Sequence, residues 1–248
     1  MSGSQFPISD VEFQNHKPVF EDTADAIMAF MAQKSPTEIA SLMGISNQLA
    51  IKARTLAYEF PHKITGIKAL DAFIGQAFRA LDIKSIPAEK LDESQQNLRI
   101  ISSVYGVLKP FDIIKPYRSE FNKSIAPDNK TPIQLFKLKN TIDIVNFIKE
   151  NKVKDIINLL PGDADKCLDW KIIRAFSSVH KICFQTITSD GKFKTPIAKR
   201  LKELRGLMYR LILQKDIQSF QQLISIDSPD FVFSPDHSKP GLPVFISY

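Results

Sequence analysis

The amino-acid sequence predicts an α+β fold, in one compact domain over residues 1–248 with a helical N-terminal half and a mixed sheet built mainly from the C-terminal half. Two patterns lead to this prediction. Apolar residues recur at helical spacing between residues 22 and 108, whereas short β-branched and aliphatic runs bounded by turn residues begin at residue 155. Because strands and helices do not alternate regularly along the chain, the pattern excludes a doubly wound parallel sheet.

The N-terminal half is predicted to start with an extended lead-in over residues 1–20, containing one short strand, and to continue as helices. Ser35 and Glu38 are spaced as a capping box, which indicates a helix start between them. Pro110 disfavours helical geometry at the residue before it, so the last of these helices should end near residue 108. The apolar spacing places the helices at residues 22–33, 37–43, 45–60, 68–80 and 94–108.

The C-terminal half is predicted to hold most strands. The aliphatic run at residues 155–160 ends at Pro161-Gly162 and is typical of a buried strand. The run at residues 179–188 alternates and precedes an Asp190-Gly191 turn, which predicts a hairpin with a partner strand from Phe193. The remaining expected elements are a basic helix at 197–214, a shorter helix at 217–225, and strands within 230–235 and 243–248.

Composition excludes several classes of protein. No apolar run approaches the roughly 20 residues of a membrane-spanning helix, and the first ten residues lack the basic and apolar regions of a secretion signal. We therefore expect a cytoplasmic protein that contacts no membrane. The 2 cysteines and 4 histidines fall in no metal-ligand spacing, so we expect reduced thiols, no metal and no cofactor. The formal net charge of +6 points to an anionic partner.

The segment 97–118 crowds polar side chains around one glycine and two prolines. Fixed turns with converging polar tips are typical of a binding pocket. Asp112 follows Lys109 and precedes Arg118, so its carboxylate belongs either to a site for a polar or anionic ligand or to a structural ion pair that holds the turn. The chain has no HExxH, GxSxG or Walker sequence, so no catalytic residue is assigned. The pocket candidates are Arg99, Tyr105, Lys109, Asp112, Tyr117 and Arg118, with Arg205 from the basic helix.

Residues 36–60 resemble a helix-hairpin-helix DNA-binding element, although Ser46 stands where its second glycine is usual. Gly44 can take positive φ and lets a phosphate approach the backbone, while free amides at the next helix start point outward. An ordinary turn between helices, with Gly44 as C-cap and Ser46 as N-cap, explains the same residues without DNA. The candidate DNA contacts are Gly44, Ser46, Asn47, Gln48, Lys52 and Arg54.

The helix predicted at residues 197–214 is amphipathic and basic. Its apolar stripe, which starts at Ile197 and includes Leu201, is expected in the core. Gly206 in mid-helix costs roughly 1 kcal/mol relative to alanine, which predicts that another element approaches closely. The basic face is either a DNA contact or an ordinary solvated surface. The candidate contacts on it are Lys199, Lys202 and Arg210.

Together these segments resemble the YaaA family of peroxide-stress proteins along most of the chain. The family hallmark, hLRILSGLYGxLRPxDxIxPYRLEM, is similar to residues 97–121. The family patterns LMxISxxLA, AlxAFxG and KkARGxM are similar to residues 42–50, 69–75 and 202–208. The sequence departs from the family at Phe6-Pro7-Ile8-Ser9, where a lysine is usual, at Lys109, and at residues 160–164, which replace an Ala-Ser-x-Glu-Tyr segment.

The resemblance implies a cytoplasmic α+β protein of the family's own fold that binds DNA and limits iron-dependent oxidative damage during hydrogen peroxide stress. We expect a monomer that binds duplex DNA with little sequence preference. The alternative is an enzyme acting on a nucleotide or a damaged base, in a pocket formed by the segment 97–118 and the helix 199–210. A divergent relative that keeps only the fold is the third possibility.

Overall fold

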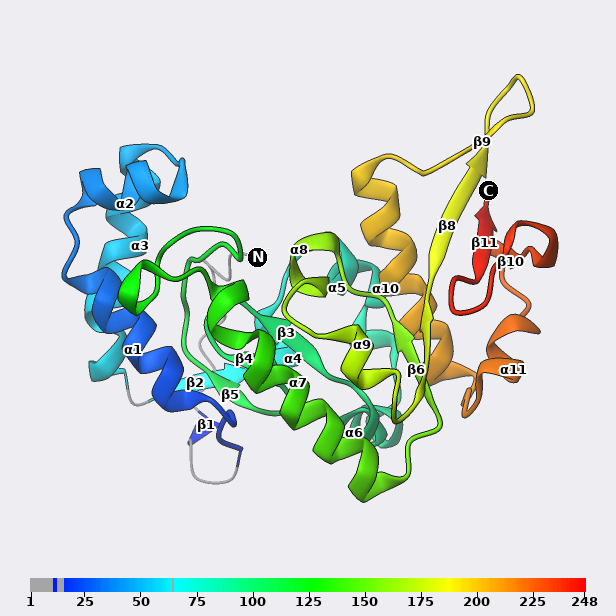
Figure 1. Ribbon diagram of the computed structural model, residues 1–248, viewed down its shortest axis with the longest axis horizontal. Helices are drawn as coiled ribbons and strands as arrows, with labels where there is room; N and C mark the ends of the chain where they lie inside the picture. Colours follow the sequence, from blue (N-terminus) through cyan, green and yellow to red (C-terminus); the bar gives the residue numbers. More distant parts are fainter. Residues whose placement is uncertain (1–10, 13–15, 64) are drawn as a thin grey trace. The chain divides into compact units, whose positions relative to one another are not determined.

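The computed structural model describes residues 11–12, 16–63 and 65–248, and these confirm the predicted α+β class (Figure 1). Contacts within the chain group it into two compact units, which are described separately. Unit 1 comprises residues up to 73, 95–143 and 162–169, and unit 2 comprises residues 74–94, 144–161 and 170–248. The single domain over residues 1–248 stays a prediction. Of the expected lead-in, residues 1–10 and 13–15 lie outside the described residues.

Unit 1 contains three N-terminal helices where the sequence predicts them, and the third helix packs against each of the first two (Figure 1). Ala50, Ala53 and Ala57 form the buried side of the third helix, and such small side chains let the first two helices pack close to it. The predicted capping box is confirmed, because Ser35 N donates to Glu38 Oε2 (2.7 Å) and Glu38 N donates to Ser35 Oγ (3.2 Å). The elements are α1 (Glu21–Ala32), α2 (Pro36–Met43), α3 (Asn47–Glu59) and the 3₁₀ helix η1 (Phe60–His62).

The rest of unit 1 holds two small antiparallel sheets. One has the strand order β1-β2-β5, and the other is a hairpin of β3 and β4. The strands are β1 (Val11–Glu12), β2 (Thr65–Lys68), β3 (Ile100–Ser102), β4 (Gly106–Leu108) and β5 (Ile113–Ile114). The helical elements are α4 (Ala69–Ala72), η3 (Pro127–Asn129) and α8 (Gly162–Asp165), and two longer helices, α6 (Ala88–Asn97) and α7 (Pro132–Asn151), contribute to both units.

The predicted helix over residues 94–108 is wrong, because α6 ends at Asn97 and the following residues form the β3–β4 hairpin. Every residue from Ile100 to Leu108 is buried, so both faces of the hairpin lie in the interior. The alternation of apolar and polar residues that marks a half-exposed strand is therefore absent. Gly106 has a φ of +66°, which lies outside the range of an α-helix. The predicted helix over 68–80 is also interrupted, and the long helix α7 carried no sequence prediction.

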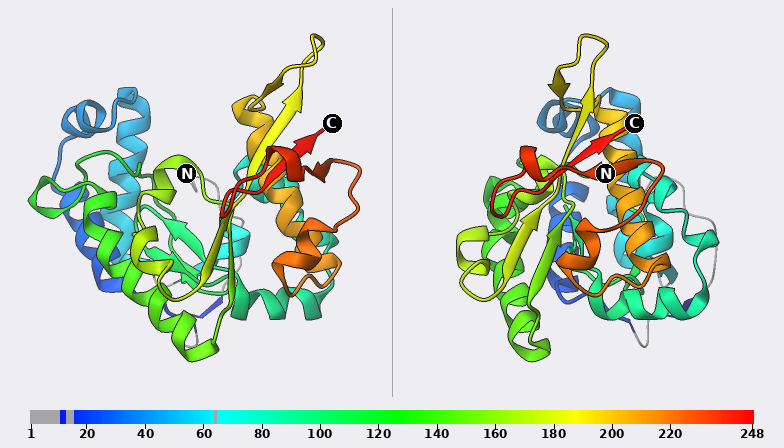
Figure 2. Two further views of the ribbon diagram at one scale, coloured as in Figure 1. Left: turned by 45° about the vertical axis from the view of Figure 1, so that its right-hand side comes forward. Right: turned by 90° about the vertical axis from the view of Figure 1, so that its right-hand side faces the viewer.

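Unit 2 is built on a four-stranded mixed sheet with the order β10-β11-β8-β9 (Figure 2). The central pair β11 and β8 is parallel and both edge strands are antiparallel, which confirms the mixed sheet predicted for the C-terminal half. A second, two-stranded parallel sheet joins β6 and β7. The strands are β6 (Asp155–Asn158), β7 (Ser178–Lys181), β8 (Cys183–Ile187), β9 (Phe193–Lys194), β10 (Phe231–Phe233) and β11 (Val244–Ser247).

One face of the four-stranded sheet is covered by helices. Phe184 and Phe245 of the sheet pack in one cluster with Leu204 and Met208 of α10 and with Leu223 of α11. The helices of this unit are α5 (Gln76–Leu81), η2 (Ile83–Ser85), α9 (Trp170–Ile173), α10 (Ala198–Gln214), α11 (Phe220–Ile224) and η4 (Pro235–His237). None of the described helices is both long and apolar enough to cross a membrane.

Candidate nucleic-acid interface

The connection between α2 and α3 is a tight turn held by two helix caps. Gly44 takes φ +67° and ψ 41° as the C-cap of α2, and its N–H donates to the carbonyl of Ala40 (2.9 Å). Ser46 caps α3 by accepting from the N–H of Leu49 (3.4 Å). These are the roles that an ordinary turn between helices assigns to the two residues. The helix-hairpin-helix assignment of residues 36–60 therefore stays a prediction.

A lysine from elsewhere in unit 1 lies at this turn. A Cβ placed on Gly44 would lie 3.5 Å from Lys123 Nζ, so the ammonium group is next to the glycine backbone. Among the described residues, Lys123 forms no ion pair. Ser46, Asn47 and Gln48 beside it are exposed, and the first amides of a helix have no partner within the helix. The turn thus joins outward N–H groups to a positive charge, which is a favourable arrangement for a phosphate.

The sequence gives no indication that Lys123 belongs to this site, because no local pattern connects it with Gly44. Two other candidates differ in their surroundings. Lys52 is exposed and makes no ion pair in the described part of the chain. Arg54, in contrast, donates a hydrogen bond from Nε to the carbonyl of Lys34 (3.0 Å), a residue in the connection between α1 and α2. Part of its hydrogen-bonding capacity therefore holds the helices together.

In unit 2, α10 packs against α5 at Gly206, which confirms the predicted close approach. A Cβ on Gly206 would collide with the carbonyl oxygen of Ala77 in α5. Leu204 and Met208 are buried as expected. The prediction is wrong for Ile197, which is 73% exposed because it precedes the first turn of α10 rather than lying on its inner face.

The basic residues of α10 divide into paired and unpaired groups. Arg210 lies 3.8 Å from Asp82 Oδ2, and Arg200 pairs with Asp230 (3.2 Å) and Glu203 (4.0 Å). Lys199 and Lys202 are exposed, and neither has an ion pair with a residue that the structure describes. These two lysines therefore offer the least compensated charge on the helix.

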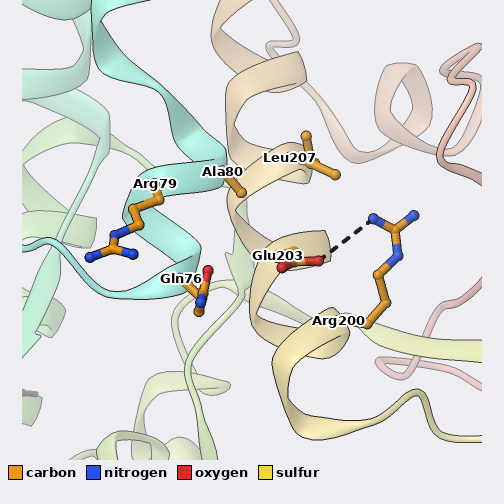
Figure 3. Close-up of a pocket in the computed structure, with 6 residues that line it drawn as sticks. All are labelled: Gln76, Arg79, Ala80, Arg200, Glu203 and Leu207. Atoms are coloured by element: carbon orange, nitrogen blue, oxygen red, sulfur yellow. Dashed lines mark ion pairs between the residues drawn. The ribbon is translucent and has the colours of Figure 1, made fainter.

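A shallow hollow of about 290 Å³ lies between α5 and α10 (Figure 3). Its charged side chains are Arg79, Arg200 and Glu203, and the ion pair between the last two spans one side of it. Because Glu203 already neutralises part of this charge, the hollow is less suited to an anion than the free lysines are. The lining residues are Gln76, Arg79, Ala80, Arg200, Glu203 and Leu207.

The tyrosines of the segment 97–118 are structural groups of the interior of unit 1. Tyr105 and Tyr117 are 2% and 1% exposed, and their rings meet edge to face with centroids 5.8 Å apart. Tyr117 shares a hydrogen bond with Ser102 Oγ (2.9 Å), and Tyr105 Oη accepts from the N–H of Lys115 (2.9 Å). Burial raises the pKa of Tyr117 to about 12 and that of Tyr105 well above its ordinary value. Both phenols are therefore neutral at pH 7.

Asp112 holds the turn that follows β4. Its Oδ2 accepts from the N–H of Lys109 (2.8 Å), so it fixes the turn through the backbone. Of the two alternatives for this carboxylate, the structural ion pair has no partner among the described residues, and the ligand site stays a prediction. Burial raises the pKa of Asp112 from 3.8 to about 6, although this hydrogen bond and the charges of Lys109 and Arg99 act in the opposite direction. Arg99 Nη1 donates to the carbonyl of Leu98 (2.7 Å) at the end of α6.

A side chain of α7, which the sequence analysis did not single out, supports the same segment. Asn140 Oδ1 accepts from the N–H of Val107 (3.0 Å), and its Nδ2 donates to the carbonyl of Cys167 (3.2 Å). A Cβ on Gly106 would collide with Asn140 and with Phe136. Gly106 thus allows α7 to pack directly against the hairpin, a contact for which a single sequence offers no signal.

Two polar atoms near the end of the segment are buried and unpaired within the described structure, namely Arg118 Nε and Ser119 Oγ. Buried polar groups without a partner are rare, so this is where the segment has unused hydrogen-bonding capacity. Lys109 is exposed. Arg205 belongs to unit 2 and the other pocket candidates to unit 1. The pocket that would combine them stays a prediction.

Comparison with known proteins extends over nearly the whole chain. A family model described as peroxide stress protein YaaA matches residues 4–237. A UPF0246 protein of Shewanella denitrificans is 30% identical over 253 residues, covering 97% of this chain and 96% of the relative. A UPF0246 protein of Albidiferax ferrireducens is 31% identical over 234 residues, covering 92% and 88%. One from Shewanella pealeana is 30% identical over 235 residues, covering 92% and 89%.

Proposed function

The chain belongs to the YaaA family of peroxide stress proteins, and from that premise we propose that it binds duplex DNA through the phosphates and so limits iron-dependent oxidative damage. The observation that carries this proposal is the position of Lys123 Nζ beside Gly44, at the start of α3. An ammonium group next to a glycine backbone and free helix amides suits one phosphate. No carboxylate of the described residues pairs with this lysine.

The second contribution comes from α10 in unit 2. Lys199 and Lys202 lie three residues apart on one helix, so their side chains are neighbours on its surface. Both are exposed. Lysines and backbone amides contact phosphate and sugar, which carry no direct sequence information, so we expect little sequence preference.

The link to oxidative damage follows from the counterions of DNA. Duplex DNA holds a layer of condensed cations, and a protein that neutralises phosphates releases them. Iron cations held in this layer would be displaced from the sites that the protein covers. In this account the protein acts in the cytoplasm, as a monomer, by covering DNA, and it needs no iron ligands of its own.

The turn between α2 and α3 is tested by replacing its lysine. Lys123→Gln should lower the slope of log affinity against log salt by about 0.9, because one phosphate contact is lost. Fluorescence anisotropy with a labelled duplex over a range of KCl concentrations measures this slope. Lys130→Gln is the matched control, since Lys130 lies in the same connection and is exposed but pairs with Asp128 (3.3 Å). Equal slopes for the two variants would exclude the turn as a phosphate site.

The α10 site is tested in the same assay by Lys199→Gln/Lys202→Gln. The slope should fall by about 1.8, twice the effect of one contact. Lys84→Gln/Lys171→Gln carries the same change in net charge at exposed lysines outside α10. A slope that depends only on net charge, and not on which pair is replaced, would contradict this part of the proposal.

A further inference from the structure

The outward side of α3 is exposed from one end of the helix to the other. Successive residues are about 100° apart on a helix, so four side chains lie opposite the buried alanines and the half-buried Leu49 and Leu56. Ile51 is 52% exposed and Tyr58 is 63% exposed, which leaves apolar surface open to solvent. We call this row of four exposed side chains the outer stripe, and its members are Gln48, Ile51, Thr55 and Tyr58.

Cationic side chains lie on both sides of the outer stripe. Lys52 and Arg54 are two residues apart, so they project to opposite flanks of α3, and both are exposed. The hydrogen bond from Arg54 Nε to the carbonyl of Lys34 holds the guanidinium group on its flank. Glu59, the one acidic residue in the sequence of α3, is at the C-terminal end and lies 3.8 Å from Lys63. The outer stripe is therefore an uncharged row between two positive edges.

The N-terminal end of the outer stripe adjoins the proposed phosphate site. Lys123 Nζ lies beside Gly44 in the turn before α3, and Gln48 belongs to the first turn of this helix. A phosphate held at the turn would bring one DNA strand to the start of α3. The rest of the stripe would then face the groove that borders this strand. A helix that follows another helix and a short turn binds DNA in this way in helix-turn-helix proteins.

The dimensions and the chemistry of α3 fit one groove of duplex DNA. A helix with its side chains is about 10–12 Å across, which matches the major groove, about 12 Å wide, and exceeds the minor groove, about 6 Å wide. In the major groove the base edges form the floor and the two phosphate backbones form the sides. Glutamine and threonine side chains bind base edges, and an aliphatic side chain contacts the thymine methyl group. The uncharged stripe thus suits the floor, and its positive edges suit the sides.

From this match we propose that α3 lies in the major groove of duplex DNA, with Gln48, Ile51 and Thr55 against base edges and Lys52 on a phosphate. The inference rests on the proposed function and deepens it, because it assigns the groove that the protein enters. An apolar protein surface would gain nothing from the two positive edges, and a single strand offers no second backbone. Charge complementarity thus selects the duplex. A threonine hydroxyl both donates and accepts, so the contact requires no fixed sequence.

The groove is tested with two labelled duplexes of the same mixed sequence. In one of them every cytosine is replaced by glucosylated 5-hydroxymethylcytosine, whose sugar fills the major groove. The unmodified protein should bind this duplex at least about fivefold more weakly, because the side chains lose their contacts with the base edges. Netropsin, a ligand that occupies the minor groove, should not displace the protein from the plain duplex. Fluorescence anisotropy at one KCl concentration measures both effects.

The stripe itself is tested by Gln48→Ala/Ile51→Ala. This variant should bind the plain duplex at least about fivefold more weakly and should distinguish less between the two duplexes. Its salt slope should stay unchanged because no charge is lost. Ile142→Ala/Asn146→Ala is the matched control, since it truncates an exposed aliphatic and an exposed amide side chain on α7. All four side chains are exposed, and circular dichroism confirms that each variant is folded.

The outcomes separate the inference from the function on which it rests. Equal affinity of the unmodified protein for the plain and the glucosylated duplex would overturn the groove assignment while phosphate binding stands. Displacement by netropsin, or full affinity of Gln48→Ala/Ile51→Ala, would overturn it as well. If the unmodified protein does not bind the plain duplex at all, the proposed function fails and the inference fails with it.

Discussion

At the scale of single residues, burial raises the pKa values of Tyr105, Asp112 and Tyr117 in the segment 97–118 and so favours their uncharged forms. Tyr105 and Tyr117 lie in the interior of unit 1 with their hydroxyls hydrogen-bonded. Asp112 is 3% exposed and accepts a backbone N–H. A buried carboxylate that gains only one such bond is less stable as an anion than it is in water. Ionisation of Asp112 therefore costs more free energy in the folded protein than in the unfolded chain.

Asp112→Asn should reveal this cost, because the free energy of unfolding of the variant should depend on pH differently from that of the unmodified protein. The carboxyl has a pKa of about 6 in the folded protein and 3.8 ordinarily, so between these values the folded state binds more protons than the unfolded state. The free energy of unfolding of the unmodified protein therefore falls as the pH rises from about 4 to about 6. Asparagine keeps an acceptor for the N–H of Lys109 without the charge.

Chemical denaturation of both proteins between pH 4 and pH 7 measures the effect. The difference in stability, variant minus unmodified protein, should increase with pH by up to about 3 kcal/mol, since one pKa unit corresponds to about 1.4 kcal/mol. Contributions of other groups cancel in this difference. A difference that stays constant, or that decreases with pH, would show that Asp112 is charged at no cost.

Residue roles could be predicted from the sequence where the partners are close along the chain. Ser35 and Glu38, three residues apart, form the expected capping box, and Gly44 takes the expected positive φ. Lys123 and Asn140 could not be predicted in this way. Each acts on a glycine region far away in sequence, and one chain without relatives carries no signal for such contacts.

At the scale of elements, the packing of α10 on α5 shows why a glycine stands in the middle of a helix. Gly206 is buried, and the backbone of Ala77 occupies the space where a Cβ would lie. Glycine has a low helix propensity, so it lowers the intrinsic stability of α10 at this position. In return α5 lies directly against α10, and this packing positions the hollow of Figure 3.

Gly206→Ala distinguishes this packing from simple helix propensity by the sign of its effect. Propensity alone would stabilise the protein by roughly 1 kcal/mol. Overpacking against Ala77 should outweigh that gain and lower the free energy of unfolding by about 2 kcal/mol. Urea denaturation monitored by circular dichroism gives the value. Increased stability in the alanine variant would mean that the two helices are not in close contact.

The elements differ in how well their sequence pattern predicts them. The strands β10 and β11 and the amphipathic α10 show the period expected of their type and lie within a residue or two of the predicted bounds. The single strand predicted over residues 179–188 is wrong, because this run is divided into β7 and β8, which belong to different sheets. The β3–β4 hairpin was predicted as a helix because it is buried on both faces. Helical spacing predicts Ile197 in the core, but Ile197 is the N-cap residue before the start of α10 and is exposed.

At the scale of the whole molecule, the net charge of +6 includes lysines in each unit that form no ion pair among the described residues. Lys123 lies at the turn before α3 in unit 1, and Lys199 and Lys202 lie on α10 in unit 2. Each of these positions is next to a structured backbone rather than on an isolated loop. The α+β class and the family followed from the sequence, whereas the distinction between paired and unpaired cations required the structure.

The most direct test of this account is the affinity of the unmodified protein for a labelled duplex of mixed sequence, measured across KCl concentrations. With four lysines as contacts (Lys52, Lys123, Lys199 and Lys202), the log–log slope should be about −3.6, at about −0.9 for each phosphate, and unrelated duplex sequences should give the same slope. Absence of binding at low salt, or an affinity that does not change with salt, would contradict the account.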